Sequence, residues 1–574
     1  MKRVISLAIL AASLNLAAFA QDINPTVTVT NIYEGEASGI VKPTQPLHIP
    51  DSVSRFNLDF DYAVFENPYQ GSYDFRPYAV QIRPQSSVVK DGKLYLKGGL
   101  GYTLHPDLHL VYTPVSSPNL VVSLFANHES YFGNLWNYNA PVMGDFAFKA
   151  NPGDKTAQAA HRGASDAGAR LRWAWDNGQI SAAAAWNNVF SSIDRGQPYS
   201  HGANYASLDL GFESLDTKLD YKFGLNLRSG ADVSKAAPYR MGATEIKADF
   251  SLGSIEIGYH TASVDVDGGV QILGGDANSV NGSVAIVPSD EFWIWEWQFK
   301  VGLCVSVLFG NDKTAAPMYW ETTHTPMFTK KGQWVFPRVT VTRMFSKAFT
   351  LDLGVTGGEK YASYWDFVQE HPYLGTLNAV GAFMDNTVEK VNAWTGVRGI
   401  ISDSFQYNLK AGYRLVDNDL MWKAVPDYTG VADALPHLGY GNYSQAYAKL
   451  STEWVVEPFN LKGNYELGKA WIHGNDPFFA PPVFKGSLKG TYHWGERIRA
   501  GIRGDWATRR VADMAGATIT LPGYVDLGLF GEFQWRRNLS FWLNAGNLLN
   551  QTVMTDPFIA ERGISFTVGA ILKL

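Results

Sequence analysis

The end of this sequence, from Pro522 to Leu574, constrains the fold more than any other stretch because it alternates with a period of two residues. Every second residue from Val525 to Trp535 is apolar or glycine, and the run from Ile564 to Leu574 repeats the pattern. One apolar and one polar face over about ten residues is typical of a strand that crosses a membrane in a β-barrel. The alternative is a strand of a soluble β-sandwich, whose apolar face would cover a core.

The first twenty residues have the pattern of a secretion signal. Lys2 and Arg3 precede an apolar run, and Ala18-Phe19-Ala20 is a small-residue cleavage site, so we expect residues 1–20 to be a signal peptide. No later segment reaches the roughly 18 consecutive apolar residues of a membrane-spanning helix. A secreted chain without such a helix can cross a membrane only as a closed barrel.

Composition agrees with a barrel and excludes several other classes of protein. The chain has 18 Trp, 28 Tyr, 32 Phe and 55 Gly, and barrels need aromatic rings at both membrane interfaces and glycine in tight places. The net charge of -6 argues against a nucleic-acid partner. A single cysteine, Cys304, excludes an intrachain disulfide. Because no hydrolase, metalloprotease or nucleotide-binding motif occurs, we expect neither enzymatic activity, nor a cofactor, nor a metal site.

The alternation continues in segment after segment from residue 93 to residue 574. In 405–416 the apolar face contains Leu409 and the polar face Lys410, and in 497–508 Ile502 alternates with Arg499. Because Lys or Arg facing lipid costs about 2–4 kcal/mol at the membrane midplane, the charged faces must line a lumen. We therefore predict an all-β fold, a transmembrane antiparallel β-barrel of about 22 strands over residues 93–574.

Short and long connections alternate along the predicted barrel, with short turns on the periplasmic side and long loops outside. The long connections include 131–163, 262–280, 310–334, 360–385 and 423–443. His105 and His109 flank the one short outer turn, and we expect both to be solvated. Because the loops 131–163, 310–333 and 360–385 carry many aromatic residues, we expect some of them to fold inward or over the mouth and close it.

Residues 21–92 differ from the barrel. Pro43, Pro46 and Pro50 interrupt regular structure, so we expect an irregular periplasmic segment with two short strands. Thr26, Val27, Thr28 and Val29 form a β-prone tract near the mature N-terminus. One interpretation of this tract is an ordinary strand against the barrel mouth or a partner.

Basic side chains gather on two neighbouring predicted strands near the end of the chain. The polar faces of 482–495 and 497–508 form a basic ladder of Lys485, Lys489, Arg497, Arg499 and Arg503. The ladder could attract anionic solutes. It could equally pair with internal carboxylates such as Asp526 and Glu532.

Several stretches resemble a known family of outer-membrane barrels. Near the end, Tyr524-Val525-Asp526-Leu527-Gly528-Leu529 and Asn547-Leu548-Leu549-Asn550 before the last amphipathic strand resemble the end of TonB-dependent receptor barrels. Other stretches resemble a plug-less group of such barrels, and they are Lys42-Pro43 through Arg83-Pro84, residues 97–102 and residues 357–374. The resemblance implies the outer membrane of a Gram-negative-type bacterium. If TonB engages the chain, the resemblance also implies that Thr26, Val27, Thr28 and Val29 form a TonB-box-like segment. The chain departs from the family in one respect. Members of the family have a folded plug ahead of the barrel, whereas here only some seventy residues, interrupted by prolines, lie ahead of the predicted barrel.

Two functions follow from this interpretation. The first is solute transport or uptake, with loops or a partner closing the lumen. The second is a non-transporting scaffold within an outer-membrane protein complex. Both imply outer-membrane lipid as surroundings and a protein partner in the outer membrane or periplasm.

Overall fold

A computed structural model gives the structure of the protein and describes most residues from Lys93 onward. The described ranges are 93–102, 104–138, 155–194, 198–215, 219–233, 240–275, 278–312, 331–371, 385–402, 404–423, 437–514, 517–557 and 559–574. The expected signal peptide 1–20, the segment 21–92 and the tract Thr26–Val29 lie outside these residues.

Twenty-two antiparallel strands form the wall of a closed barrel. The first eleven are β1 (Leu94–Tyr102), β2 (His105–Ser116), β3 (Leu120–Tyr138), β4 (Lys155–Trp175), β5 (Gly178–Asp194), β6 (Pro198–Ser214), β7 (Asp220–Asp232), β8 (Met241–Ile257), β9 (His260–Gly275), β10 (Ser279–Ile294) and β11 (Trp297–Asp312). The others are β12 (Gly332–Ser346), β13 (Phe349–Tyr361), β14 (Asn386–Ile401), β15 (Phe405–Lys423), β16 (His437–Val456), β17 (Phe459–His473), β18 (Phe484–Trp494), β19 (Ile498–Ala507), β22 (Tyr524–Arg536), β23 (Leu539–Gly546) and β25 (Ser565–Lys573).

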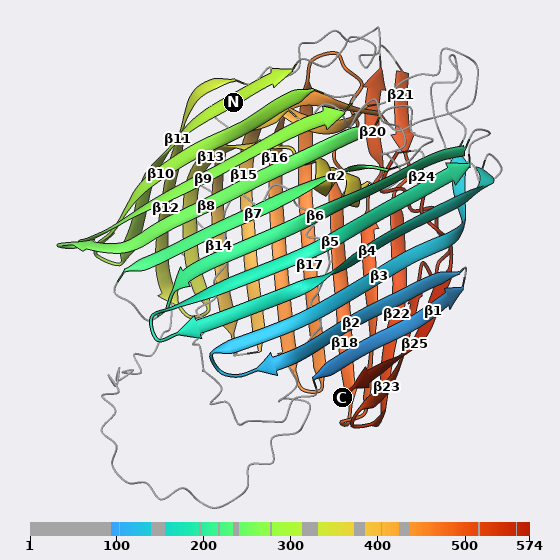
Figure 1. Ribbon diagram of the computed structural model, residues 1–574. Coiled ribbons are helices and arrows are strands. Elements are labelled where there is room, and N and C mark those ends of the chain that lie inside the picture. Colours follow the sequence, from blue (N-terminus) through green and yellow to red (C-terminus); the bar gives the residue numbers. More distant parts are fainter. Residues whose placement is uncertain are drawn as a thin grey trace, which may run out of the picture. The chain divides into compact units, whose positions relative to one another are not determined.

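Each strand pairs with its neighbour in the chain, and the last strand pairs with the first. The register of β1 and β25 sets Gly99 opposite Gly569 and Leu100 opposite Val568, which closes the barrel without a free edge. Figure 1 shows β5–β9 on the near side of the barrel and β15–β18 on the far side. The predicted all-β barrel of 22 strands is therefore confirmed.

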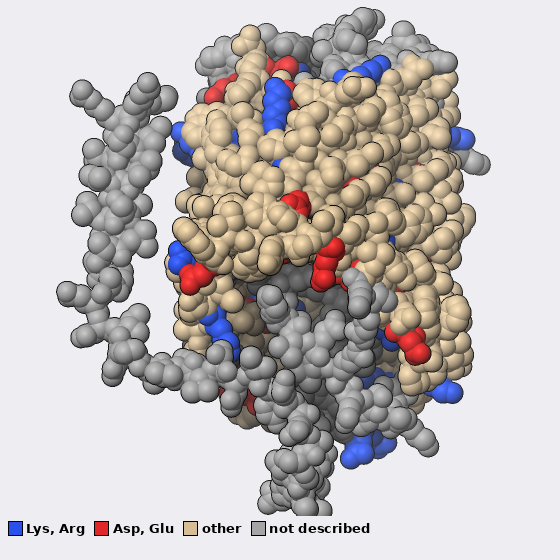
Figure 2. All heavy atoms as spheres, turned by 90° about the vertical axis from the view of Figure 1, so that its left-hand side faces the viewer, with Lys and Arg blue, Asp and Glu red and all other residues tan. Residues whose placement is uncertain are grey.

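The two faces of each strand meet different surroundings, as the alternation predicts. Ile502 and Leu409, on the predicted lipid side, are 49% and 40% exposed. Lys410 and Arg503 belong to the opposite face, which lines the lumen. Figure 2 shows one side of the outer surface, where few charged side chains interrupt an uncharged wall. Such a surface suits contact with lipid.

Aromatic side chains cluster at the short periplasmic turns. Tyr259, between β8 and β9, is 96% exposed, and Trp295, between β10 and β11, is 93% exposed. Trp494 and Trp535 are exposed at the same ends of β18 and β22. Aromatic rings of this kind occupy the membrane–water interface in barrels.

Three smaller pieces of regular structure belong to the outer connections. They are the helix α2 (Tyr364–Glu370), the hairpin of β20 (Arg510–Met514) with β21 (Ala517–Leu521), and β24 (Ile559–Ala560), which pairs with β3. In the described part of the chain, no helix has the length and apolar character needed to cross a membrane.

Three expectations about the outer side were wrong. The predicted loop 131–163 is half strand, because β3 continues to Tyr138 and β4 begins at Lys155. The predicted loop 262–280 is mostly strand, because β9 continues to Gly275 and β10 begins at Ser279. His105 is not solvated, since it lies on the lumen face of β2, is buried, and has its Nε2 2.5 Å from Thr567 Oγ1. The glycine pairs 268–269 and 274–275 and the sequence His105-Pro106-Asp107 are typical of turns, but the antiparallel ladder runs through them.

Candidate functional site

The chain between β13 and β14 turns into the lumen instead of remaining outside. Ser363 caps α2, because its hydroxyl accepts a hydrogen bond from the amide of Asp366 at 3.1 Å. Trp365 has no exposed surface, and Tyr364 and Val368 have almost none. Figure 1 shows α2 within the barrel, behind the near wall.

Small and apolar side chains on the inner wall of β5–β9 receive the helix. Trp365 stacks on Tyr205 of β6, with ring centroids 4.5 Å apart, and its indole nitrogen donates to the carbonyl of Ala243 at 3.2 Å. The cluster around them consists of Val189, Ala203, Met241, Leu273, Phe367 and Val368. Alanine at two of these wall positions leaves space for the large rings of the helix.

A buried carboxylate fixes the N-terminal end of α2. Glu245 of β8 accepts hydrogen bonds from the Ser363 hydroxyl at 2.8 and 3.0 Å and from the Trp365 amide at 3.1 Å. The Arg228 guanidinium lies 3.2 Å from Glu245 and 2.5 Å from the carboxylate of Asp366. Lys247 contacts the other oxygen of Asp366 at 3.3 Å. We call Arg228, Glu245, Lys247, Ser363 and Asp366 the latch.

Its contacts within the latch lower the pKa of Asp366. Burial alone would raise the pKa of this carboxyl group. The hydrogen bond from Arg228 and the charge of Lys247 lower the pKa by more than burial raises it. The resulting pKa is about 2, below the usual 3.8. Asp366 is therefore ionised at every physiological pH and retains both contacts.

A second polar group holds Tyr364, the first residue of the helix. The Tyr364 hydroxyl donates to Asp232 at 2.7 Å, and the same carboxylate oxygen lies 3.0 Å from Nε2 of His201. Gln271 of β9 accepts the Tyr364 amide at 2.7 Å. Because these groups are buried, each contact is worth more than it would be in water.

The far end of the helical segment reaches other parts of the barrel. Nδ1 of His371 lies 2.8 Å from Asp556, in the connection between β23 and β25. The ring of His371 also meets Trp422 of β15 edge to face, with centroids 5.1 Å apart. The segment thus contacts the near wall, the far wall and a second outer connection, so residues 363–371 cross the lumen.

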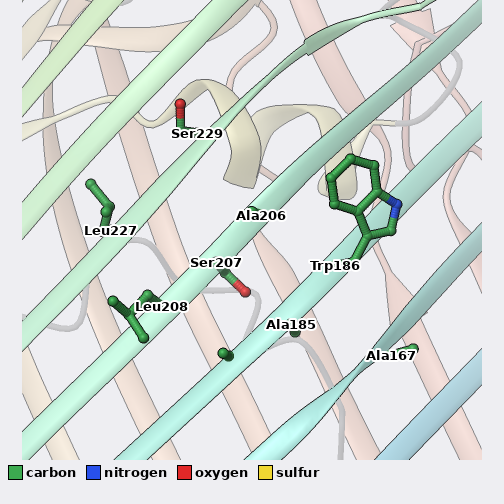
Figure 3. Close-up of a pocket in the computed structure, with 9 residues that line it drawn as sticks. Ala167, Ala185, Trp186, Ala206, Ser207, Leu208, Leu227 and Ser229 are labelled. Atoms are coloured by element: carbon green, nitrogen blue, oxygen red, sulfur yellow. The ribbon is translucent and has the colours of Figure 1, made fainter.

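A shallow groove lies on the opposite, lipid-facing side of the same wall. It is lined by alanines and by the exposed Trp186, and includes Leu208 and Ser229. Figure 3 shows this groove with α2 behind the strands. The groove and the helix are therefore on opposite sides of the wall.

The predicted basic ladder is divided between two places. Lys485 and Lys489 lie on β18, and Arg499 and Arg503 lie on β19, whereas Arg497 lies in the exposed turn between these strands. The register adds cations from β15–β17 to the same part of the lumen. The resulting set, which we call the basic wall, consists of Lys410, Lys449, Lys462, Lys485, Lys489 and Arg503.

Sequence reasoning predicted that Lys410 lines the lumen, but it did not group the cations of β15–β17 with the ladder and did not identify the latch residues of the wall. Arg228, Glu245 and Lys410 do stand on the polar face of their strands, but so do many residues without a comparable role. Of the aromatic residues expected to fold inward, Tyr364, Trp365 and Phe367 do so. The loop segments 139–154, 313–330 and 372–384 lie outside the described residues.

Comparisons with known proteins extend the description. No protein-family model and no curated protein sequence matches this chain. Among solved structures, the FrpB iron transporter of Neisseria meningitidis matches with a TM-score of 0.60 at 10% identity, covering 84% of this chain and 81% of that one.

Two further receptors match as well. The ferric enterobactin receptor PfeA of Pseudomonas aeruginosa matches with a TM-score of 0.57 at 11% identity, covering 84% of this chain and 80% of that one. The ferric-catecholate import receptor Fiu of E. coli K12 matches with a TM-score of 0.58 at 11% identity, covering 84% of this chain and 82% of that one. This chain therefore has the barrel fold of TonB-dependent outer-membrane receptors, as the resemblance in its sequence predicted.

Proposed function

We propose that this protein carries a solute across the outer membrane through its barrel, and that α2 constricts the path. The observation that supports this function most is the buried, latch-bound segment 363–371, which crosses the lumen between walls. The similar solved structures include proteins described as iron and copper transporters. A barrel of this size needs such a constriction, because an unobstructed lumen would leak small solutes.

The latch makes α2 a removable part of the path. Its wall contacts are hydrogen bonds, ion pairs and ring packing, with no covalent link among the described contacts. A helix held in this way can leave the wall when a solute or partner offers better contacts. We infer that α2 moves for passage, whereas the strands stay in place.

Conductance in planar bilayers tests the proposal. Replacing residues 363–370 by a Gly-Ser linker of equal length should raise single-channel conductance well above that of the intact protein. The matched control replaces the outer hairpin 510–521, which belongs to another connection, and should leave conductance close to that of the intact protein. Equal conductance of the intact protein and the α2 replacement would refute the constriction.

The alternative function is a non-transporting scaffold with a permanently closed lumen. The extent of the α2 contacts favours it, because about a dozen polar and aromatic contacts hold a helix of 7 residues. Purification in mild detergent separates the two functions. A stoichiometric partner, together with no conductance after α2 replacement, would favour the scaffold.

A further inference from the structure

The basic wall differs from the rest of the lumen because its cations face one another. In the ladder register Lys410 is directly opposite Lys449, Lys462 is opposite Lys489, and Lys489 is opposite Arg503. Like charges in directly opposed positions destabilise a sheet. A barrel gains no stability from this arrangement, so a counter-ion from outside the wall would relieve it.

Glu453 and Glu466 pair with three of the six cations of the basic wall, and Glu389 and Asp352 act on a fourth, Lys410. Glu466 lies 3.4 Å from Lys485 and 3.8 Å from Lys449, so that one carboxylate serves two cations. Glu453 pairs with Lys462 at 3.0 Å. On the outer side Asp505 stands opposite Asp526 in the register, which ends the cationic region.

Aromatic faces accompany the cations. The Lys410 ammonium lies 4.0 Å from the ring centroid of Trp394, and that of Lys489 lies 5.4 Å from Phe530. Lys462 and Lys485 remain 56% and 42% exposed, so the lumen solvent reaches them. Charged heads beside flat rings offer both ion pairing and stacking to a ligand.

The opposite wall carries three carboxylates on its lumen face, together with Lys247 two residues from Asp249. Asp249 of β8 is directly opposite Asp267 of β9, and Asp265 is two residues away. About ten strands separate β8–β9 from β18–β19 in the ring of 22, so the two groups face each other across the lumen.

We propose that the basic wall is a binding subsite for a solute that carries two or more negative charges, with sulfonate, phosphate or carboxylate groups beside a flat ring. Lys449, Lys485, Lys489 and Arg503 would bind the anionic groups. This inference takes its biological role from the proposed transport function, since the subsite lies between α2 and the periplasmic mouth. Binding itself does not require transport.

Dye binding to the full chain tests the subsite. The protein is purified in a non-ionic detergent, and fluorescence anisotropy measures binding of a trisulfonated pyrene, with pyrophosphate as competitor. We expect saturable binding that weakens as salt rises, because the contacts are ionic. The double variant Lys489→Gln/Arg503→Gln should bind about tenfold more weakly.

A matched control separates the site from net charge. Lys222 and Lys300 also stand on the lumen face but on β7 and β11, in the other half of the barrel. The variant Lys222→Gln/Lys300→Gln removes the same charge and should bind the dye as the original protein does. Heat-dependent gel migration checks that each variant has a folded barrel.

The outcomes are distinct. The subsite is rejected if the original protein does not bind the dye, or if both double variants lose affinity equally. Failure of the transport function would appear elsewhere, as unchanged conductance after α2 replacement. A weakened Lys489→Gln/Arg503→Gln variant with an unaffected control supports the subsite in either case.

Discussion

The near wall of the lumen, β5–β9, and the far wall, β15–β19, solve the problem of buried charge in different ways. On the near wall, Arg228 and Glu245 are satisfied by each other and by α2, which also covers the apolar rings around them. On the far wall, Lys489 and Arg503 face each other and remain open to the lumen. The difference shows that α2 completes one wall structurally and leaves the other available for a ligand.

The largest expected effect comes from removing the indole ring of Trp365, which packs against the near wall. Trp365→Ala should weaken docking of α2 by about 3–5 kcal/mol, because the cavity it leaves cannot be filled by the neighbouring alanines. Hydrogen–deuterium exchange of the amides 363–371 measures this loss directly. Protection like that of the original protein would mean that the polar latch alone holds the helix.

Removing the central carboxylate of the latch tests the polar part of the same wall. Glu245→Ala leaves Arg228 with Asp366 alone and two donors of α2 without their acceptor, at a cost of about 3–5 kcal/mol. Glu245→Gln keeps an acceptor of the same shape and should cost less. If the two variants exchange α2 amides at equal rates, charge and not hydrogen bonding dominates the latch.

The basic wall should tolerate the loss of one of its charged side chains. Lys489→Ala removes a charge that stands opposite Lys462 and Arg503, so we expect the stability of the barrel to change by no more than about 0.5 kcal/mol. Urea unfolding in lipid vesicles measures it. A large loss would show that Lys489 has a structural role and would weaken the contrast between the walls.

The smallest effect concerns pH. The pKa of Asp366 falls from 3.8 to about 2 on docking, so its contribution is complete above about pH 4 and is lost as the pH falls through the lower value. Exchange rates of the α2 amides, corrected for intrinsic chemistry, should therefore be equal at pH 7 and pH 5. If α2 leaves the wall between pH 7 and pH 5, a titrating group other than Asp366 controls its docking.

The sequence allowed prediction of the fold to a much greater extent than of the site. Period-two alternation identified the strands because lipid imposes the same rule on residues such as Ile502 and Leu409 wherever they occur. The glycine pairs 268–269 and 274–275 indicated turns, so the outer part of β9 was mistaken for a loop although Val270 and Ile272 keep the alternation. The latch depends on which strands face the chain of 363–371 across the lumen, and alternation carries no information about contacts between Arg228 and Asp366, 138 residues apart.

The aromatic residues at the periplasmic turns also fix the position of the barrel along the membrane normal. Rings such as Trp295 and Tyr259 stay at the membrane interface, so the barrel cannot slide along the membrane normal without moving them into the hydrocarbon or into water. Lys489 stands five residues from the end of its strand, which at about 3.4 Å per residue and a tilt of about 40° is roughly 13 Å along the barrel axis. A solute released from the basic wall therefore has less than half of the membrane's thickness left to travel.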